Sequence, residues 1–119
     1  MDRKWLVWAG IHGFLAVACG AFAAHALKSR LEPELLELVD KGARYQLAGA
    51  LSLLAGACLS PRLGLNILVC FALGTALFSG SLYAYAFSGV RAFGAVAPVG
   101  GSLLLLGWFL IFLNGLRKA

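Results

Sequence analysis

The sequence predicts an all-α integral membrane protein, a bundle of four transmembrane helices joined by short loops. Of its 119 residues, 61% are hydrophobic and only 13% are charged, whereas a soluble domain is about 45–50% apolar and about 25% charged. The mean hydropathy is +0.88. The apolar residues form four long runs, and all ten Lys and Arg residues lie at or near the ends of those runs. These observations indicate that lipid covers most of the exterior.

The chain is expected to form a single four-helix transmembrane domain, residues 1–119, with spans over residues 5–27, 43–59, 63–87 and 93–116. A helix rises about 1.5 Å per residue, so runs of this size suit a hydrocarbon core about 30 Å thick. Backbone groups cannot stay unpaired in lipid, so each span should be helical. Arg3 and Lys4 before the first apolar run, with Ala21-Phe22-Ala23 inside it, also resemble a signal peptide. We expect that first span to stay uncleaved.

The longest polar stretch, residues 28–41, is the only place for an element outside the spans. Pro33 suits the first turn of a helix, and Glu34 and Glu37 suit its positive N-terminal end. We therefore expect an interfacial helix in this first loop, able to continue into the second span.

Aromatic residues fall at both predicted interfaces, the pattern of membrane aromatic belts. The terminus side carries Trp5, Trp8 and Trp108, and the opposite side carries Tyr45, Tyr83 and Tyr85. The positive-inside rule gives no orientation, because five basic residues fall on each side. They are Arg3, Lys4, Arg62, Arg117 and Lys118 on the terminus side, and Lys28, Arg30, Lys41, Arg44 and Arg91 on the other. We favour cytoplasmic termini.

Small residues recur at helical spacing in every span, which predicts close helix packing. Lipid provides no hydrophobic drive between helices, so close backbone approach takes its place. The pattern fits a tight bundle and a homo-oligomer equally well. The predicted packing residues are Gly13, Gly20, Ala24, Ser52, Gly56, Gly80, Gly100, Gly101 and Gly107.

Polar residues of the spans are predicted to gather in the half of the membrane beside the first loop. Such residues are costly in lipid and usually face the bundle, where they hydrogen-bond between helices or mark a ligand or ion site. His25 is the best single candidate for a site, because imidazole can donate, accept or titrate. The terminus side offers His12, Asn66 and Asn114. The predicted cluster is His25, Lys28, Arg44, Tyr45, Gln46, Ser79, Ser81, Tyr83, Pro98 and Ser102.

Enzymatic chemistry, metal binding and cofactor binding find no support in the sequence. The spans contain no Asp or Glu, so paired-carboxylate catalysis is excluded from them, and we name no catalytic residue. His12 lies on the same helix as His25, roughly 20 Å away, so the two cannot share a metal ion. Cys19, Cys58 and Cys70 lack metal-site or disulfide spacing and are interpreted as apolar fillers. The scattered basic residues, net charge +5, suit lipid headgroups rather than nucleic acid.

Four sequence blocks carry a resemblance that covers nearly the whole chain. They are Gly20 to Lys28 (GAFAAHALK), Arg44-Tyr45-Gln46, Phe78 to Tyr83 (FSGSLY), and Pro98-Val99-Gly100-Gly101 followed by Gly107-Trp108. In this order they resemble a bacterial membrane family catalogued as domain of unknown function 423, which is related to the eukaryotic transmembrane protein 256. The resemblance implies a four-helix protein of the bacterial inner membrane, and it implies no activity.

The chain departs from that family's pattern at two positions. Ala23 stands where the family usually has Gly, and Gly49 stands where it usually has His. The second departure removes a possible partner for His25, which argues against a paired-His metal or proton-relay role.

Three functional hypotheses remain. The leading one is a non-enzymatic structural or assembly component that associates with copies of itself or with a larger membrane complex. The rival is a transporter or channel for a small solute, ion or proton, with segment 94–101 as its flexible element. Its lining would be His25, Arg44, Tyr45, Gln46, Ser79 and Tyr83. The third is lipid or quinone binding in an apolar groove ending at Lys28, Arg44 or Arg91.

Overall fold

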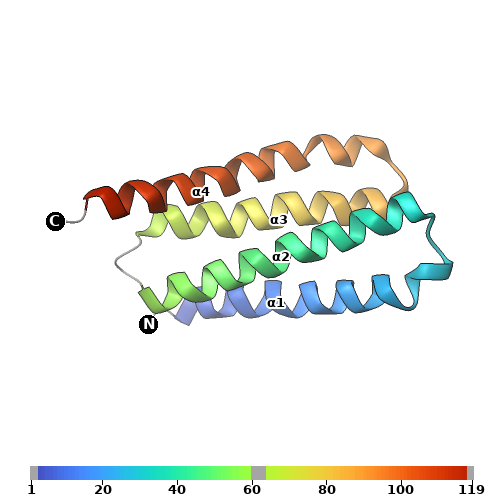
Figure 1. The fold of residues 1–119 in the computed structure, drawn as a ribbon, viewed down its shortest axis with the longest axis horizontal. Helices are drawn as coiled ribbons and strands as arrows, with labels where there is room; N and C mark the ends of the chain where they lie inside the picture. The colour runs from blue at the N-terminus through green and yellow to red at the C-terminus, as the bar shows by residue number, and fades with distance from the viewer. Residues whose placement is uncertain (1–2, 60–63, 118–119) are drawn as a thin grey trace.

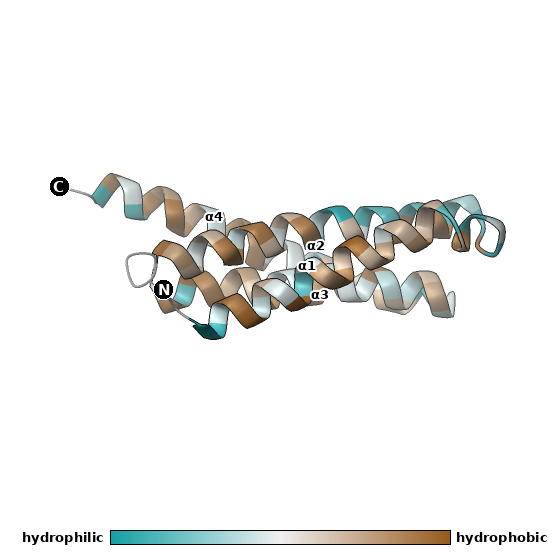
Figure 2. Ribbon diagram, turned by 90° about the horizontal axis from the view of Figure 1, so that it is seen from below, coloured by the Kyte–Doolittle hydropathy of each residue, from teal (hydrophilic) through white to brown (hydrophobic). Residues whose placement is uncertain are grey.

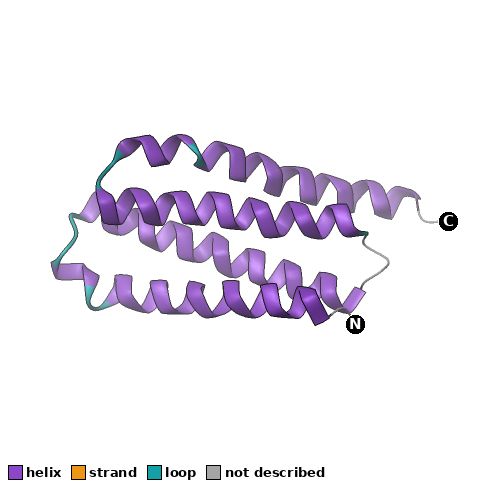
Figure 3. Ribbon diagram, turned by 180° about the vertical axis from the view of Figure 1, so that it is seen from behind, coloured by secondary structure: helices purple, strands orange, loops and turns teal. Residues whose placement is uncertain are grey.

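The computed structural model describes residues 3–59 and 64–117, and these form four long helices that alternate in direction (Figure 1). The long helices are α1 (Arg3–Ala24), α2 (Pro33–Leu59), α3 (Leu65–Ser88) and α4 (Ala97–Arg117). Two short 3-10 helices, η1 (Leu27–Ser29) and η2 (Arg91–Ala95), lie before α2 and α4. Figure 3 shows helices and loops, and no strand, over the described part of the chain. The predicted start of the third span, Arg62 and Lys118 fall outside the described residues.

The helices pack in chain order, with α1 against α2, α2 against α3 and α3 against α4 (Figure 1). The molecule measures 53 × 25 × 18 Å, so its long dimension exceeds the thickness of a hydrocarbon core. Over half of the apolar stretch of α3 is buried, whereas only 11% of the apolar stretch that includes α4 is buried. The fourth helix therefore rests on α3 with most of its surface free for lipid.

The predicted interfacial helix and second span are one continuous helix, α2. Pro33 is its first residue, a position where the missing N–H of proline costs nothing, and Glu34 follows in the first turn. Because α2 begins at Pro33 rather than at residue 43, it is 27 residues long. Gln46 is consequently the central residue of α2 and not a residue of its entrance.

Glycine and proline mark the turn between α3 and α4. Gly89 ends α3 with a φ of 74°, and its N–H donates to the carbonyl of Tyr85 at 2.7 Å. That left-handed conformation strongly favours glycine, and it satisfies a carbonyl at the helix end. Segment 94–101, where a flexible element was considered, comprises the end of η2 and the first turn of α4, in which Pro98 lies.

Two apolar clusters fill the inside of the bundle at opposite ends. The cluster nearer the termini is built around Trp5, Leu53, Ala57, Ile67, Leu68 and Phe71. The cluster nearer the first loop is built around Ala23, Val39 and Ala86. Between them lie most of the buried polar side chains: His12, Gln46, Thr75 and Ser79.

Three stretches are long and apolar enough to cross a membrane: Arg3–Ala24, Leu65–Ser88 and Arg91–Arg117. The remaining long helix, α2, carries charged residues over its first turns, which Figure 2 shows as hydrophilic ribbon at one end. Its second half is apolar and lies between α1 and α3 (Figure 1). The charged end of α2 thus extends toward the side of the first loop.

Candidate functional site, a buried polar layer

The centre of the bundle holds a chain of hydrogen bonds that joins three helices. The Tyr83 hydroxyl of α3 donates to Oε1 of Gln46 in α2 at 2.8 Å. Nε2 of Gln46 then donates to Nδ1 of His12 in α1 at 3.0 Å. Since the Gln46 amide uses its oxygen to accept from Tyr83 and its nitrogen to donate, His12 is the tautomer that carries its proton on Nε2. One glutamine therefore connects α1, α2 and α3.

A second bond ties α2 to α3 close to this chain. The Ser79 hydroxyl donates to the backbone carbonyl of Gly42 at 2.7 Å. The missing side chain of Gly42 also leaves room for the Tyr83 ring, which would lie 2.8 Å from a β-carbon at that position. Glycine is therefore required at this point of α2 for the Tyr83 hydroxyl to reach Gln46.

Thr75 completes the layer by packing against a second glycine of α2. Its side chain is fully buried, and a β-carbon at Gly49 would overlap it, lying 2.8 Å from Cγ2. The position where related chains were expected to carry His therefore has no room for a side chain here. Among the described residues, Oγ1 of Thr75 makes no hydrogen bond. Nε2 of His12 faces the backbone of Ala72, but it makes no hydrogen bond of good geometry.

The layer is buried, apart from Tyr83, which is partly exposed. His12 and Gln46 are each 4% exposed, and Ser79 is fully buried. Three cavities of the described region are lined by other residues, and none reaches His12, Gln46, Ser79 or Tyr83. Such an arrangement can hold helices together, because each hydrogen bond made in a low-dielectric interior replaces an unpaired polar group.

The structure divides the ten predicted cluster residues into separate places. Gln46, Ser79 and Tyr83 belong to the layer, and the Ser81 hydroxyl bonds the Phe78 carbonyl of its own helix at 2.9 Å. Exposed residues at the first-loop end are His25, Lys28 and Arg44. Arg44 pairs there with Asp40 of α2 at 3.0 Å. The last three, Tyr45, Pro98 and Ser102, line a groove between α2 and α4.

The prediction placed His25 in the polar cluster and left His12 outside it, and the structure has the reverse. Two features explain the difference. First, α1 ends at Ala24, so His25 follows the helix and is exposed. Second, α2 begins at Pro33, so Gln46 lies at the depth of the middle of α1, where His12 is. The sequence signal for a helix start at Pro33 could have been used to place Gln46 at the same depth as His12.

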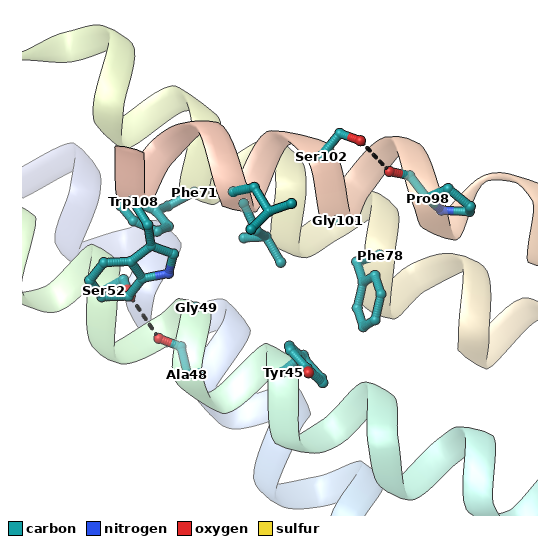
Figure 4. A pocket seen from close by; sticks show the side chains of 12 residues that line it. Tyr45, Ala48, Gly49, Ser52, Phe71, Phe78, Pro98, Gly101, Ser102 and Trp108 are labelled. Carbon is teal, nitrogen blue, oxygen red and sulfur yellow. Dashed lines mark hydrogen bonds between the residues drawn. The ribbon is translucent and has the colours of Figure 1, made fainter. Parts of the chain in front are cut away.

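The groove between α2 and α4 has a floor formed by α3. Its volume is about 480 Å³. Figure 4 shows Tyr45 and Phe78 at one end, with ring centroids 4.8 Å apart, and Phe71 and Trp108 at the other, 5.1 Å apart. Both serine hydroxyls of the lining are occupied, because Ser52 bonds the Ala48 carbonyl and Ser102 bonds the Pro98 carbonyl, and most of the remaining lining is apolar. The groove therefore presents apolar surface.

Most of the predicted packing glycines are used inside the chain. A β-carbon would lie 3.6 Å from Ala50 at Gly13, 3.8 Å from Ala43 at Gly20, and 3.2 Å from the Phe71 ring at Gly107. At Gly100 it would overlap the backbone of Phe78. Gly56 is buried in α2, Ser52 and Gly101 line the groove, and Ala24 lies beside the pocket between α1 and α2. Gly80 is different, because a side chain there would meet open space.

Within residues 3–59 and 64–117, no three His, Cys, Asp or Glu side chains come close enough together to hold a metal ion. The three cysteines in this part of the chain are free thiols, with Cys70 buried, Cys19 partly buried against Tyr83, and Cys58 exposed.

Fold and composition together define a small multi-pass α-helical membrane protein. A family model described as "Protein of unknown function (DUF423)" matches residues 19–101. A UPF0382 membrane protein of Haemophilus influenzae is 39% identical over 114 residues, covering 91% of this chain and 90% of the relative. The UPF0382 inner membrane protein YgdD of Escherichia coli is 38% identical, covering 98% and 92%. A UPF0382 membrane protein of Staphylococcus saprophyticus is 33% identical, covering 94% and 96%.

The chain belongs to the DUF423 family, which is also called UPF0382. It is a multi-pass protein of the bacterial inner membrane. No solved structure matches it.

Proposed function

We propose that this chain is a non-enzymatic structural component of the inner membrane, a rigid helical unit that associates laterally with copies of itself or with a larger membrane complex. The observation that carries the proposal is the closed polar layer. His12, Gln46, Ser79 and Tyr83 bond to one another or to backbone across helix boundaries, and they line none of the three cavities described above. Polar residues used in this way stabilise a bundle.

The transport hypothesis has less support. A solute or proton path needs polar side chains that face a cavity continuous with one side of the membrane. His25, its leading candidate, is exposed beyond the end of α1, and Arg44 is paired with Asp40 at the exposed end of α2. The groove between α2 and α4 is mostly apolar.

Lateral association has a candidate surface on the outward side of α3. Ala76 and Gly80 are exposed and four residues apart, and a β-carbon at Gly80 would meet nothing within 4 Å. Small residues at this spacing let two helix backbones approach closely in lipid. Leu73 and Phe87, also exposed on α3, provide apolar contact area beside them.

The test is energy transfer between donor- and acceptor-labelled copies in liposomes, measured while lipid dilutes the protein. We expect transfer to persist on dilution in the natural chain and to fall in Gly80→Leu, because a leucine separates the two backbones. Gly115→Leu is the matched control, since Gly115 is also open but lies on α4. A chain that shows no transfer at any density, and that cross-links to no other protein in native membranes, would contradict the proposal.

A further inference from the structure

The groove between α2 and α4 is shaped for a narrow occupant. Its wall on α4 runs from Pro98 to Trp108, ten residues apart, which is about 15 Å of helix. This is half of a hydrocarbon core about 30 Å thick, so the groove covers the depth of one leaflet. A partner helix that crosses the membrane would need contact over the full thickness.

The volume of the groove also fits a narrow occupant. About 480 Å³ spread over that length is a narrow space, and it is too short for a helix that crosses the membrane. One extended hydrocarbon chain fits this width. The aromatic pairs at the two ends, Tyr45 with Phe78 and Phe71 with Trp108, bound the space along its length (Figure 4).

A basic residue lies at the first-loop end of the groove. Lys41 is one turn before Tyr45, and the spacing of Lys41, Tyr45, Ala48 and Ser52 places them on one face of α2. Lys41 is exposed. Of its acidic neighbours on α2, Asp40 is paired with Arg44, and Glu37, one turn before Lys41, lines the pocket between α1 and α2. Arg91, exposed in η2, adds a second positive charge to the end of the bundle where α4 begins.

We propose that this groove binds one acyl chain of an anionic phospholipid, with the phosphate at Lys41 and the chain running between α2 and α4 toward Trp108. The Tyr45 ring, half exposed at the mouth, packs beside the first carbons of the chain. Attraction between a basic residue and anionic headgroups holds the lipid in this orientation. Because α4 packs against α3 alone, a gap remains between α2 and α4, and the lipid chain would fill this gap.

The proposal is tested by native mass spectrometry of the full chain, released from detergent with phosphatidylglycerol or phosphatidylcholine added. We expect one phosphatidylglycerol to remain on the natural chain. Gly101→Leu should abolish this retention, because Gly101 lines the groove and its β-carbon would have only ordinary contact with the Phe78 ring, at 3.7 Å. Ala48→Leu fills the groove from the opposite wall and should also abolish lipid retention. Because two variants are used, the misfolding of one does not decide the test.

Gly115→Leu, on the same helix but outside the groove, is the control and should retain the lipid. Lys41→Gln should lower the preference for phosphatidylglycerol over phosphatidylcholine by about fivefold. Equal retention in the natural chain, Gly101→Leu and Ala48→Leu would overturn the site. A quinone retained in place of phospholipid, or a dimer lost on filling the groove, would overturn the choice of occupant.

Discussion

At the scale of single residues, Gln46 is the group on which the interior depends. Its amide accepts from one neighbour through oxygen and donates to another through nitrogen, without carrying a charge. It meets Tyr83 through its oxygen and His12 through its nitrogen. Removing the amide would leave two polar groups unpaired in a low-dielectric layer, and this loss is larger than that of one isolated bond.

We predict that Gln46→Leu lowers the free energy of unfolding by about 1–2 kcal/mol, because two interhelical hydrogen bonds are lost and their partners stay buried. Thermal or denaturant unfolding in detergent measures the change. Ser102→Ala is the control, since its hydroxyl is exposed and bonds only the Pro98 carbonyl of its own helix. An equal loss in both variants would mean that the layer contributes nothing specific.

The sequence predicted the residue types of the layer but not its membership. Gln46, Ser79 and Tyr83 were identified because polar groups in apolar runs are costly and must find partners. His12 was missed because its depth relative to Gln46 depends on where α2 begins, and hydropathy alone places that start too late. Thr75 was missed because threonine in a helix usually draws no attention, and only Gly49 on the facing helix shows that it is buried.

At the scale of helices, the seam between α3 and α4 depends on one glycine of a pair. A β-carbon at Gly100 would lie 2.8 Å from the Gly74 carbonyl oxygen and from Cα of Phe78, which are backbone atoms that cannot move aside. A β-carbon at Gly101 would be 3.7 Å from the Phe78 ring, an ordinary contact. The sequence spacing predicted that both glycines are packing residues. Their roles differ only because of the way in which α4 is rotated about its own axis.

We therefore predict opposite effects for two adjacent substitutions. Gly100→Ala should lower the free energy of unfolding by about 1–3 kcal/mol, because α4 must move away from α3. Gly101→Ala should be neutral or raise it by up to about 1 kcal/mol, because alanine is the better helix former. Parallel unfolding curves in one detergent make the comparison, and two equal effects would show that the seam is not packed as described.

At the scale of the whole molecule, four antiparallel helices bring both ends of the described chain to the same end of the bundle (Figure 1). The sequence could predict the helix count from its apolar runs. It could not predict which side of the membrane each end faces, because the basic residues are equally divided. It also placed the start of the second span at residue 43 and expected a loop helix able to continue into it, and α2 is one helix from Pro33 to Leu59.

We predict that tags at the two termini are accessible from the same side of the membrane. The reason is that α2 crosses together with α1, α3 and α4, although its composition is the least apolar of the four. Protease digestion of oriented membrane vesicles, with a tag on each end in turn, measures this. Tags that are cleaved from opposite sides would show that α2 does not cross.

The central claim is that the polar residues form a closed layer and not a path through the membrane, and the most direct measurement is the labelling of Ser79→Cys by a water-soluble thiol reagent. The variant is made in a chain whose own three cysteines are replaced by alanine, with Lys41→Cys as the control. Ser79 is fully buried between α2 and α3, and Lys41 is exposed on α2. The closed layer predicts rapid labelling at position 41 and none at position 79. Labelling at both positions at similar rates would contradict the account, because it would show that water reaches the centre of the bundle.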